Sequence, residues 1–347
     1  MQVKVFASSP LQVVCAAEFL ASDICAGADQ ADLFVVNSVS LANARQAVET
    51  AVRCKLQFRQ LGSVRQFPVL DRWRLFHAVR REVEALSEKD ILAVGNPAYD
   101  LFADALGRAG RARKYVLDDG VMTIRYLAGI VAGEKNWSGL PSTLPSRLTR
   151  KFLIGTSDAP DWSRLCWFSM FADYFPQLDN VMLNDFAKLR SRQSNLSLES
   201  KVLFLGAPLA SVGMYEEETY DRICRKTATL LRNRYPDCEL VYLCHRSEGD
   251  AESTARSRFD SIEVSSGPVE LRWLEPGEHR PVAIAGVMSS ALFSLREILP
   301  SSTKVHAFWP DETYPVKAAG RDPSSLRPVF EQSANLGKIS LEVVSSF

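Results

Sequence analysis

The chain has 347 residues, more than a single hydrophobic core usually organises, so its length favours two domains. Hydrophobic residues make up 46% and charged residues 24% of the sequence, which excludes a wholly disordered chain. Acidic and basic residues balance at 41 each, which excludes a general electrostatic attraction to nucleic acid.

The cysteines and the apolar runs indicate where the protein works. The seven cysteines form no C-x-x-C pair and lie in apolar surroundings, as buried reduced thiols do, so we expect neither disulfides nor a zinc site. The first ten residues lack the pattern of a signal peptide, and no apolar run approaches the roughly 20 residues that cross a bilayer. We therefore expect a cytoplasmic protein, with peripheral contact to the inner membrane left open.

Strand and helix patterns alternate from the start of the chain. Ser9 and Pro10 suit a helix start, with Gln12 at the capping-box position. The expected strands are 3–7, 32–37, 90–95 and 114–120, the last ending in a turn, and the expected helices begin at 10, 41, 71 and 97. This alternation predicts a doubly wound parallel sheet.

The alternation returns in the second half of the chain. The expected strands there are 201–206, 239–245, 282–290 and 303–309, and the expected helices are 216–234 and 291–299. We expect a Rossmann-type domain at 1–190 with an irregular insertion at about 133–185, a polar linker, and a second such domain at 200–347. The fold class is α/β, and the two halves resemble the GT-B architecture of many sugar transferases, with the active site in a cleft between the domains.

The sequence KYVLDDG at 114–120 ends a buried strand on Asp118, Asp119 and Gly120. In an open α/β sheet the carboxyl ends of the strands face the ligand, so a carboxylate here is a candidate general base. Successive strand residues point to opposite sides, so only one aspartate should face the site. The alternative is that the aspartates and the glycine only form a turn.

Two further strand ends carry polar side chains. His245 ends an apolar strand and is followed by Arg246, and it could hold a phosphate oxygen or protonate a leaving group. Ser289 and Ser290 lie between a strand and a helix, where hydroxyls and the helix start can bind one phosphate. The alternatives are a buried hydrogen-bonded histidine and an ordinary helix cap.

The absence of several motifs limits the classes of ligand that the protein is expected to bind. The sequence has no D-x-D triplet, no Walker loop and no G-x-G-x-x-G loop, so no metal site is expected. A single-phosphate site suits a nucleoside monophosphate better than a triphosphate or a dinucleotide.

The ordered set of motifs resembles the bacterial sialyltransferases, which carry a D/E-D-G motif, a His-Pro motif and a serine pair in this order. The stretches SPLQ at 9–12 and FLGAP at 204–208 also have counterparts in glycosyltransferase family fifty-two, which acts on lipooligosaccharide and capsule. This chain departs from the family at His245-Arg246, where proline is usual, and at Val212, where some members place an acidic residue before the glycine.

The resemblance implies an inverting sialyltransferase that uses a CMP-activated nonulosonic acid, such as CMP-sialic acid, without a metal or another cofactor. Asp119, with Asp118 as the alternative, would be the base, and His245 would contact the CMP phosphate. The expected substrate-binding residues are Gly120, Gly206, Arg246, Ser289 and Ser290.

The acceptor is the least defined partner. The implied acceptor is a glycan or glycolipid of lipopolysaccharide or capsule biosynthesis, with Arg147, Arg150 and Lys151 as candidate contacts or merely as a solvated basic face. The alternatives are a transferase using CMP-Kdo or a UDP-sugar, and a nucleotide-sugar-binding protein without catalysis. A homodimer is left open.

Overall fold

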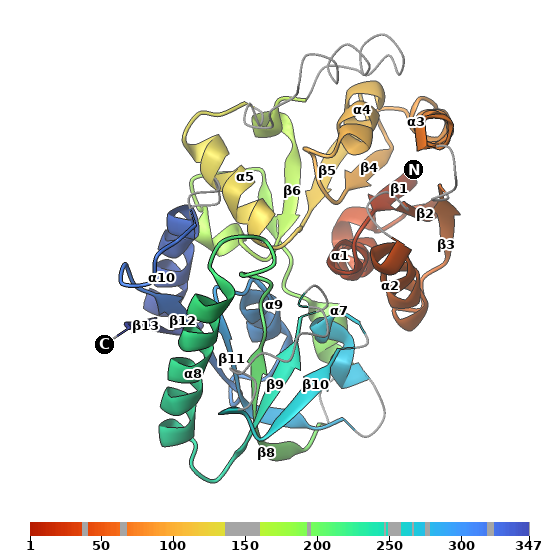
Figure 1. Cartoon of the computed structure of the whole chain (residues 1–347). Coiled ribbons are helices and arrows are strands. Elements are labelled where there is room, and N and C mark those ends of the chain that lie inside the picture. The colour runs from red at the N-terminus through yellow and green to blue at the C-terminus, as the bar shows by residue number, and fades with distance from the viewer. Residues whose placement is uncertain are drawn as a thin grey trace. The chain divides into compact units, whose positions relative to one another are not determined.

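The computed structural model describes residues 1–36, 41–62, 68–135, 160–192, 196–245, 248, 258–265, 267–274, 278–317 and 323–346. The chain divides into two compact units, Met1–Lys188 (unit 1) and Leu189–Phe347 (unit 2). Each unit is built around one parallel sheet (Figure 1). The predicted fold class, two α/β units of the Rossmann type, is confirmed.

Within the described residues, seven parallel strands form the sheet of unit 1. They are β1 (Gln2–Ala7), β2 (Gln30–Val36), β3 (Phe58–Leu61), β4 (Ile91–Val94), β5 (Arg113–Leu117), β6 (Cys166–Ser169) and β7 (Val181–Leu183). Their order in the sheet is β3-β2-β1-β4-β5-β6-β7. The order reverses between β1 and β4, and such a switch point is where open α/β sheets bind ligands.

Helices cover both faces of this sheet. Those in the described residues are α1 (Pro10–Ala21), α2 (Leu41–Arg53), α3 (Pro68–Val83), α4 (Asp100–Arg108) and α5 (Val121–Val131). Because parallel crossovers are right-handed, connections that run in opposite directions along the sheet place their helices on opposite faces. In agreement, α1 packs on α2 and α3 packs on α4.

The described part of unit 2 has a six-stranded parallel sheet. Its strands are β8 (Leu198–Leu205), β9 (Glu239–Cys244), β10 (Ser261–Val264), β11 (Arg280–Val287), β12 (Lys304–Pro310) and β13 (Ser340–Val344). The order is β10-β9-β8-β11-β12-β13, so this sheet has its switch point between β8 and β11.

The helices in the described part of unit 2 are α8 (Glu217–Arg234), α9 (Ala291–Ile298) and α10 (Arg327–Asn335), and α7 (Ala187–Ser191) spans the boundary between the units. The crossovers through α8 and α9 run in opposite directions along the sheet, which places these helices on opposite faces.

The central strands are mainly apolar because both faces of each sheet are covered. All four residues of β4 (ILAV) are fully buried, as are Ala283, Ile284 and Ala285 of β11. Continuous apolar runs of this kind are typical of parallel sheets. These runs made the central strands readable from the sequence.

The segment expected to be irregular is partly regular. Its described second half contains β6 and β7, which extend the sheet of unit 1 beyond β5. The expectation of an insertion was wrong here, because prolines, glycines and tryptophans surround these two short strands and conceal their pattern.

Candidate functional site

Three loops of unit 1 meet at the carboxyl ends of β1, β4 and β5. Gln12 lies in the first turn of α1 after β1, Asn96 follows β4 and Asp119 follows β5. Gln12 Nε2 donates a hydrogen bond to Asp119 Oδ1 at 2.8 Å, and Asn96 Nδ2 donates one to Asp119 Oδ2 at 2.7 Å. Both carboxylate oxygens of the partly exposed Asp119 are therefore held in position by the switch point of the sheet.

Neighbouring groups fix the orientation of the two amides. Gln12 Oε1 accepts a hydrogen bond from the main-chain N–H of Ser8 at 2.8 Å. Asn96 Oδ1 accepts from the Tyr126 hydroxyl at 3.0 Å and from the main-chain N–H of Ala98 at 2.9 Å. Because an amide has one oxygen and one NH₂ group, these contacts leave both nitrogens to face Asp119.

Two glycines shape this site. A Cβ on Gly95 would lie 2.1 Å from Gln12 Cδ, so this position must lack a side chain for Gln12 to pass. Gly120 begins α5 with φ 62° and ψ −134°, a conformation that favours glycine. The substrate-binding role predicted for Gly120 thus coincides with a backbone requirement of the turn.

Asp118 points away from Asp119 into the core of unit 1. Its carboxylate is fully buried and accepts hydrogen bonds from Ser169 Oγ at 2.5 Å and from the Met170 N–H at 2.8 Å. Burial raises the pKa of Asp118 to about 7, although these hydrogen bonds favour the ionised form. Asp118 therefore joins β5 to the end of β6, and of the two predicted bases only Asp119 reaches the surface.

In unit 2 the switch point again carries predicted residues. Gly206 follows β8, His245 follows β9 and Ser289 follows β11 after one intervening residue. Gly206 faces a carboxylate: a Cβ there would lie 2.4 Å from Glu248 Oε2 and 2.7 Å from the Tyr242 hydroxyl. The predicted contact residue Arg246 lies outside the described residues, as do Arg147, Arg150 and Lys151.

His245 is partly exposed, and its main chain is anchored by Glu248. The His245 N–H donates to Glu248 Oε2 at 2.7 Å, while Glu248 Oε1 accepts from the Tyr242 hydroxyl at 2.6 Å. The sequence gives no signal for Glu248, because a carboxylate three residues past a strand end belongs to no recognised motif.

The serine pair begins α9 without capping it. Ser290 occupies the N-cap position with φ −67° and ψ −21°, and its side chain makes no capping hydrogen bond. Neither hydroxyl of Ser289 and Ser290 has a hydrogen-bond partner within the described part of the chain. The geometry therefore does not support the alternative that the two serines form an ordinary helix cap. Both hydroxyls are available to a ligand at the positive end of the helix dipole.

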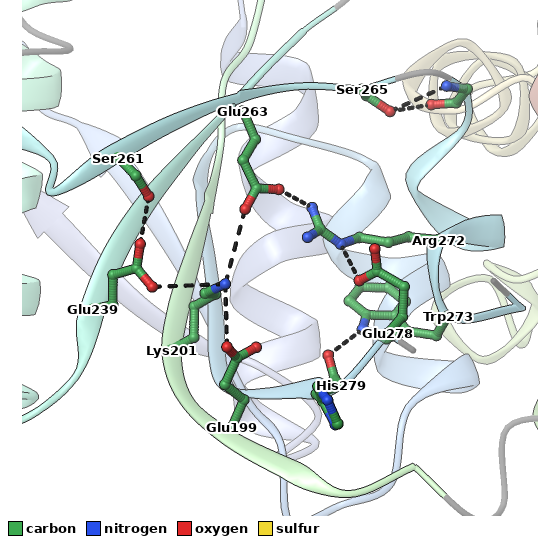
Figure 2. Close-up of polar contacts among 11 residues, drawn as sticks. Glu199, Lys201, Glu239, Ser261, Glu263, Ser265, Arg272, Trp273, Glu278 and His279 are labelled. Carbon is green, nitrogen blue, oxygen red and sulfur yellow. Dashed lines mark hydrogen bonds and ion pairs between the residues drawn. The ribbon is translucent and has the colours of Figure 1, made fainter. Parts of the chain in front are cut away.

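A separate charged cluster in unit 2 is structural (Figure 2). Lys201 Nζ contacts three carboxylates, those of Glu199 at 3.3 Å, Glu239 at 3.6 Å and Glu263 at 3.9 Å. Arg272 bridges Glu263 at 2.6 Å and Glu278 at 3.0 Å. Since each cation is shared between carboxylates, the cluster joins β8, β9 and β10 to the 3₁₀ turn Val269–Leu274.

No helix in the described residues is long and apolar enough to cross a membrane. Those residues also contain no group of three or more His, Cys, Asp or Glu side chains arranged to hold a metal ion.

Solved structures with a similar fold include glycosyltransferases of the GT-B type. The chain is similar to the GT-B domain of a sialyltransferase from Photobacterium damselae, with 15% identity, a TM-score of 0.48 and 99% and 100% of the two chains covered. The chain is also similar to an α/β-galactoside α-2,3-sialyltransferase from Photobacterium phosphoreum, with 12% identity and a TM-score of 0.49, covering 99% of this chain and 97% of that one. A heptosyltransferase from E. coli, solved with ADP, is similar with 14% identity and a TM-score of 0.42, covering 96% of this chain and 98% of that one.

No family model matches the sequence, and no curated protein is similar to it in sequence. At these identities, the side chains of the site are the basis for assigning a function.

Proposed function

We propose that the protein is an inverting glycosyltransferase that moves sialic acid or a related nonulosonic acid from a CMP-activated donor to a glycan acceptor. The acceptor class is a lipooligosaccharide or capsule glycan, as the motif order implies. Unit 1 supplies the base and unit 2 holds the donor. The reaction needs no metal, because hydroxyls, a histidine and a helix start take over the stabilisation of one phosphate.

The observation that carries the proposal is the hydrogen bonding of Asp119. Its two oxygens are held by Gln12 and Asn96 at the switch point of a doubly wound sheet. A partly exposed carboxylate in a fixed position can take a proton from an acceptor hydroxyl as the new glycosidic bond forms. Each carboxylate oxygen can accept more than one hydrogen bond, so the amide contacts leave capacity for that hydroxyl. We assign the base to Asp119 and a structural role to Asp118.

The residues at the switch point of unit 2 suit the leaving group. As the bond from the sugar to CMP breaks, negative charge develops on the single phosphate. The free hydroxyls of Ser289 and Ser290 and the start of α9 would stabilise that charge, and the His245 imidazole would donate a hydrogen bond or a proton to it. Gly206, which has no side chain, leaves room for Glu248, the residue that anchors the His245 main chain. We keep Arg246 as a proposed phosphate or carboxylate contact.

The first test compares two aspartates in one assay. The donor is CMP-N-acetylneuraminic acid, galactose-terminated glycans serve as acceptors, and CMP release is measured with EDTA present. Asp119→Asn should lower kcat at least a hundredfold while the affinity for CMP stays unchanged. Asp118→Asn should retain most of the activity. Equal losses in both variants, or full turnover without the Asp119 carboxylate, would remove Asp119 as the base.

The second test examines the donor by thermal unfolding with CMP, CDP, UMP and UDP. A ligand that binds only the folded protein adds about 2.7 kcal/mol of stability at a hundredfold excess over its Kd. CMP should stabilise the wild type most, and Ser289→Ala and His245→Ala should each reduce the shift. Stabilisation by UDP instead of CMP would favour a UDP-sugar transferase.

A further inference from the structure

A cavity of about 330 Å³ opens in unit 2 beside the ends of β8 and β9, a volume within the range of small-molecule sites. Its walls come from the loop after β8, from the first turns of α8 and from Tyr242 of β9. Glu217, Tyr220, Asp221 and Cys224 line it at helical spacing, so one stripe of α8 faces the cavity. Neither the motifs nor the proposed phosphate site accounts for this stripe.

A hydrogen-bonded chain of side chains forms part of the cavity wall. The Ala207 N–H donates to the Tyr220 hydroxyl at 2.9 Å, which lies 3.5 Å from the Tyr242 hydroxyl. Tyr242 donates to Glu248 at 2.6 Å, so its oxygen is left to accept from Tyr220. Burial raises the pKa of both tyrosines well above its usual value, and both keep their protons. The hydroxyl protons are thus used within the protein.

The charges of the lining exclude phosphate as the occupant. Four carboxylates line the cavity, those of Glu216, Glu217, Asp221 and Glu248. Among the described lining residues Lys317 is the one cation, and it pairs with Glu216 at 2.7 Å. Ionised carboxylates only accept hydrogen bonds, so a matching ligand is uncharged or cationic and presents amino or hydroxyl donors.

We propose that this cavity binds the cytidine portion of the donor and that Glu217 and Asp221 select cytosine over uracil. This inference rests on the proposed function, because it identifies the occupant from the CMP donor. Cytosine presents an exocyclic amino group that carboxylates accept from, whereas uracil presents an oxygen at the same place that carboxylates repel. The ribose hydroxyls are further donors, and Pro208 and Tyr215 supply apolar walls for the ring. The cavity shares Glu248 with the anchor of His245, which the proposed function places at the CMP phosphate.

The test is calorimetric titration of the full chain with cytidine, uridine, CMP and inorganic phosphate. Cytidine should bind at least tenfold more tightly than uridine to the wild type. Asp221→Asn and Glu217→Gln should each weaken cytidine and CMP about tenfold and reduce the preference over uridine, since each removes a charged acceptor. Neither should change the binding of phosphate.

Glu218→Gln is the matched control. It removes a carboxylate from the same turn of α8, but Glu218 is exposed and does not line the cavity. Its affinity for cytidine should equal that of the wild type. Glu217 is also exposed, so Glu217→Gln keeps the test valid even if the buried Asp221→Asn variant does not fold.

Two failures are distinguishable. If CMP binds in a Ser289-dependent way while both cavity variants bind cytidine as the wild type does, the cavity assignment is wrong and the donor proposal stands. If neither cytidine nor CMP binds the wild type, the donor proposal fails and the cavity assignment fails with it.

Discussion

Gln12 and Asp119 lie 107 positions apart in the chain and are joined by a hydrogen bond of 2.8 Å from Gln12 Nε2 to Asp119 Oδ1. This contact connects the first turn of α1 to the end of β5 across the switch point of the sheet. A change at the start of the chain therefore acts directly on the proposed base. Gln12 can take this position only because Gly95 has no side chain.

We expect Gly95→Ala to reduce both stability and transfer. The new Cβ would lie 2.1 Å from Gln12 Cδ and would displace the amide from Asp119 and Ser8. The loss of these hydrogen bonds and the overpacking should cost about 1–3 kcal/mol in the free energy of unfolding. Urea unfolding measures that cost. Gly129→Ala is the control: its nearest neighbour is the end of the exposed Glu134 side chain, so its stability should hold or rise slightly.

Asp118 should make the protein less stable as the pH rises. Its folded pKa of about 7 lies above the ordinary value of 3.8, so the folded state binds the extra proton between these values. The free energy of unfolding should therefore fall from about pH 4 to about pH 7, by an amount on the order of 4 kcal/mol. Asp118→Asn should lack this component in unfolding measured from pH 4 to 8. Parallel pH profiles for the two proteins would contradict the prediction.

His306 should make the protein more stable as the pH rises, which is the opposite of the effect expected for Asp118. Burial, and then the charge of Arg234, lower the pKa of His306 from 6.5 to about 4. Arg234 donates to Nδ1 at 3.3 Å, so Nε2 carries the proton and donates to the Tyr235 hydroxyl at 2.7 Å. Between pH 4 and 6.5 the unfolded state binds more protons than the folded state. The contribution of neutral His306 to the free energy of unfolding is therefore fully present above pH 6.5, and about 3 kcal/mol is lost as the pH falls to about 4.

His306→Gln should flatten this acid limb of the stability profile, since the amide can still accept from Arg234 and does not titrate. The measurement is chemical unfolding at pH 4.5 and pH 7. A variant that loses as much stability on acidification as the wild type would assign the acid sensitivity to other groups.

Lys201→Met should destabilise unit 2 by about 1–2 kcal/mol, because it leaves the three glutamates around Lys201 without their shared cation. Lys338→Met is the control: Lys338 pairs with Glu297 at 2.8 Å, and this variant should cost less than about 1 kcal/mol. Thermal unfolding compares the two variants, and equal costs would argue against a special role for the cluster.

The central strands and most helices could be predicted from the sequence. Buried strands show as apolar runs, and helices with one buried face show as apolar residues at helical spacing. The strands that escaped prediction are short or lie at an edge. β3 reads FRQL and is half exposed, and β10 exposes Ile262 and Val264, so neither shows the apolar signal of a covered strand. The buried β6 reads CWFS, and its neighbourhood of turn residues hid it.

The sequence could predict those residues of the candidate site that lie at the end of a single strand. The rule that strand ends face the ligand selected Asp119, and it would also have selected Asn96, which follows β4 at the same edge. Gln12 was interpreted as part of a capping box, which explains the residue locally; its contact with Asp119 depends on a fold that brings distant segments together. Strand alternation correctly predicted that Asp118 and Asp119 diverge. It could not say which one is buried, because that depends on β6.

Among the described residues, each sheet takes its strands from one continuous stretch of chain, and this has a consequence for biosynthesis. Every strand of the first sheet has been made by the time the ribosome reaches residue 188, before any strand of the second sheet exists. Parallel sheets close long loops and fold slowly, which exposes incomplete edges to aggregation. Sequential synthesis lets the first sheet form while the second is still absent, so strands of the same Rossmann order do not compete for the same partners.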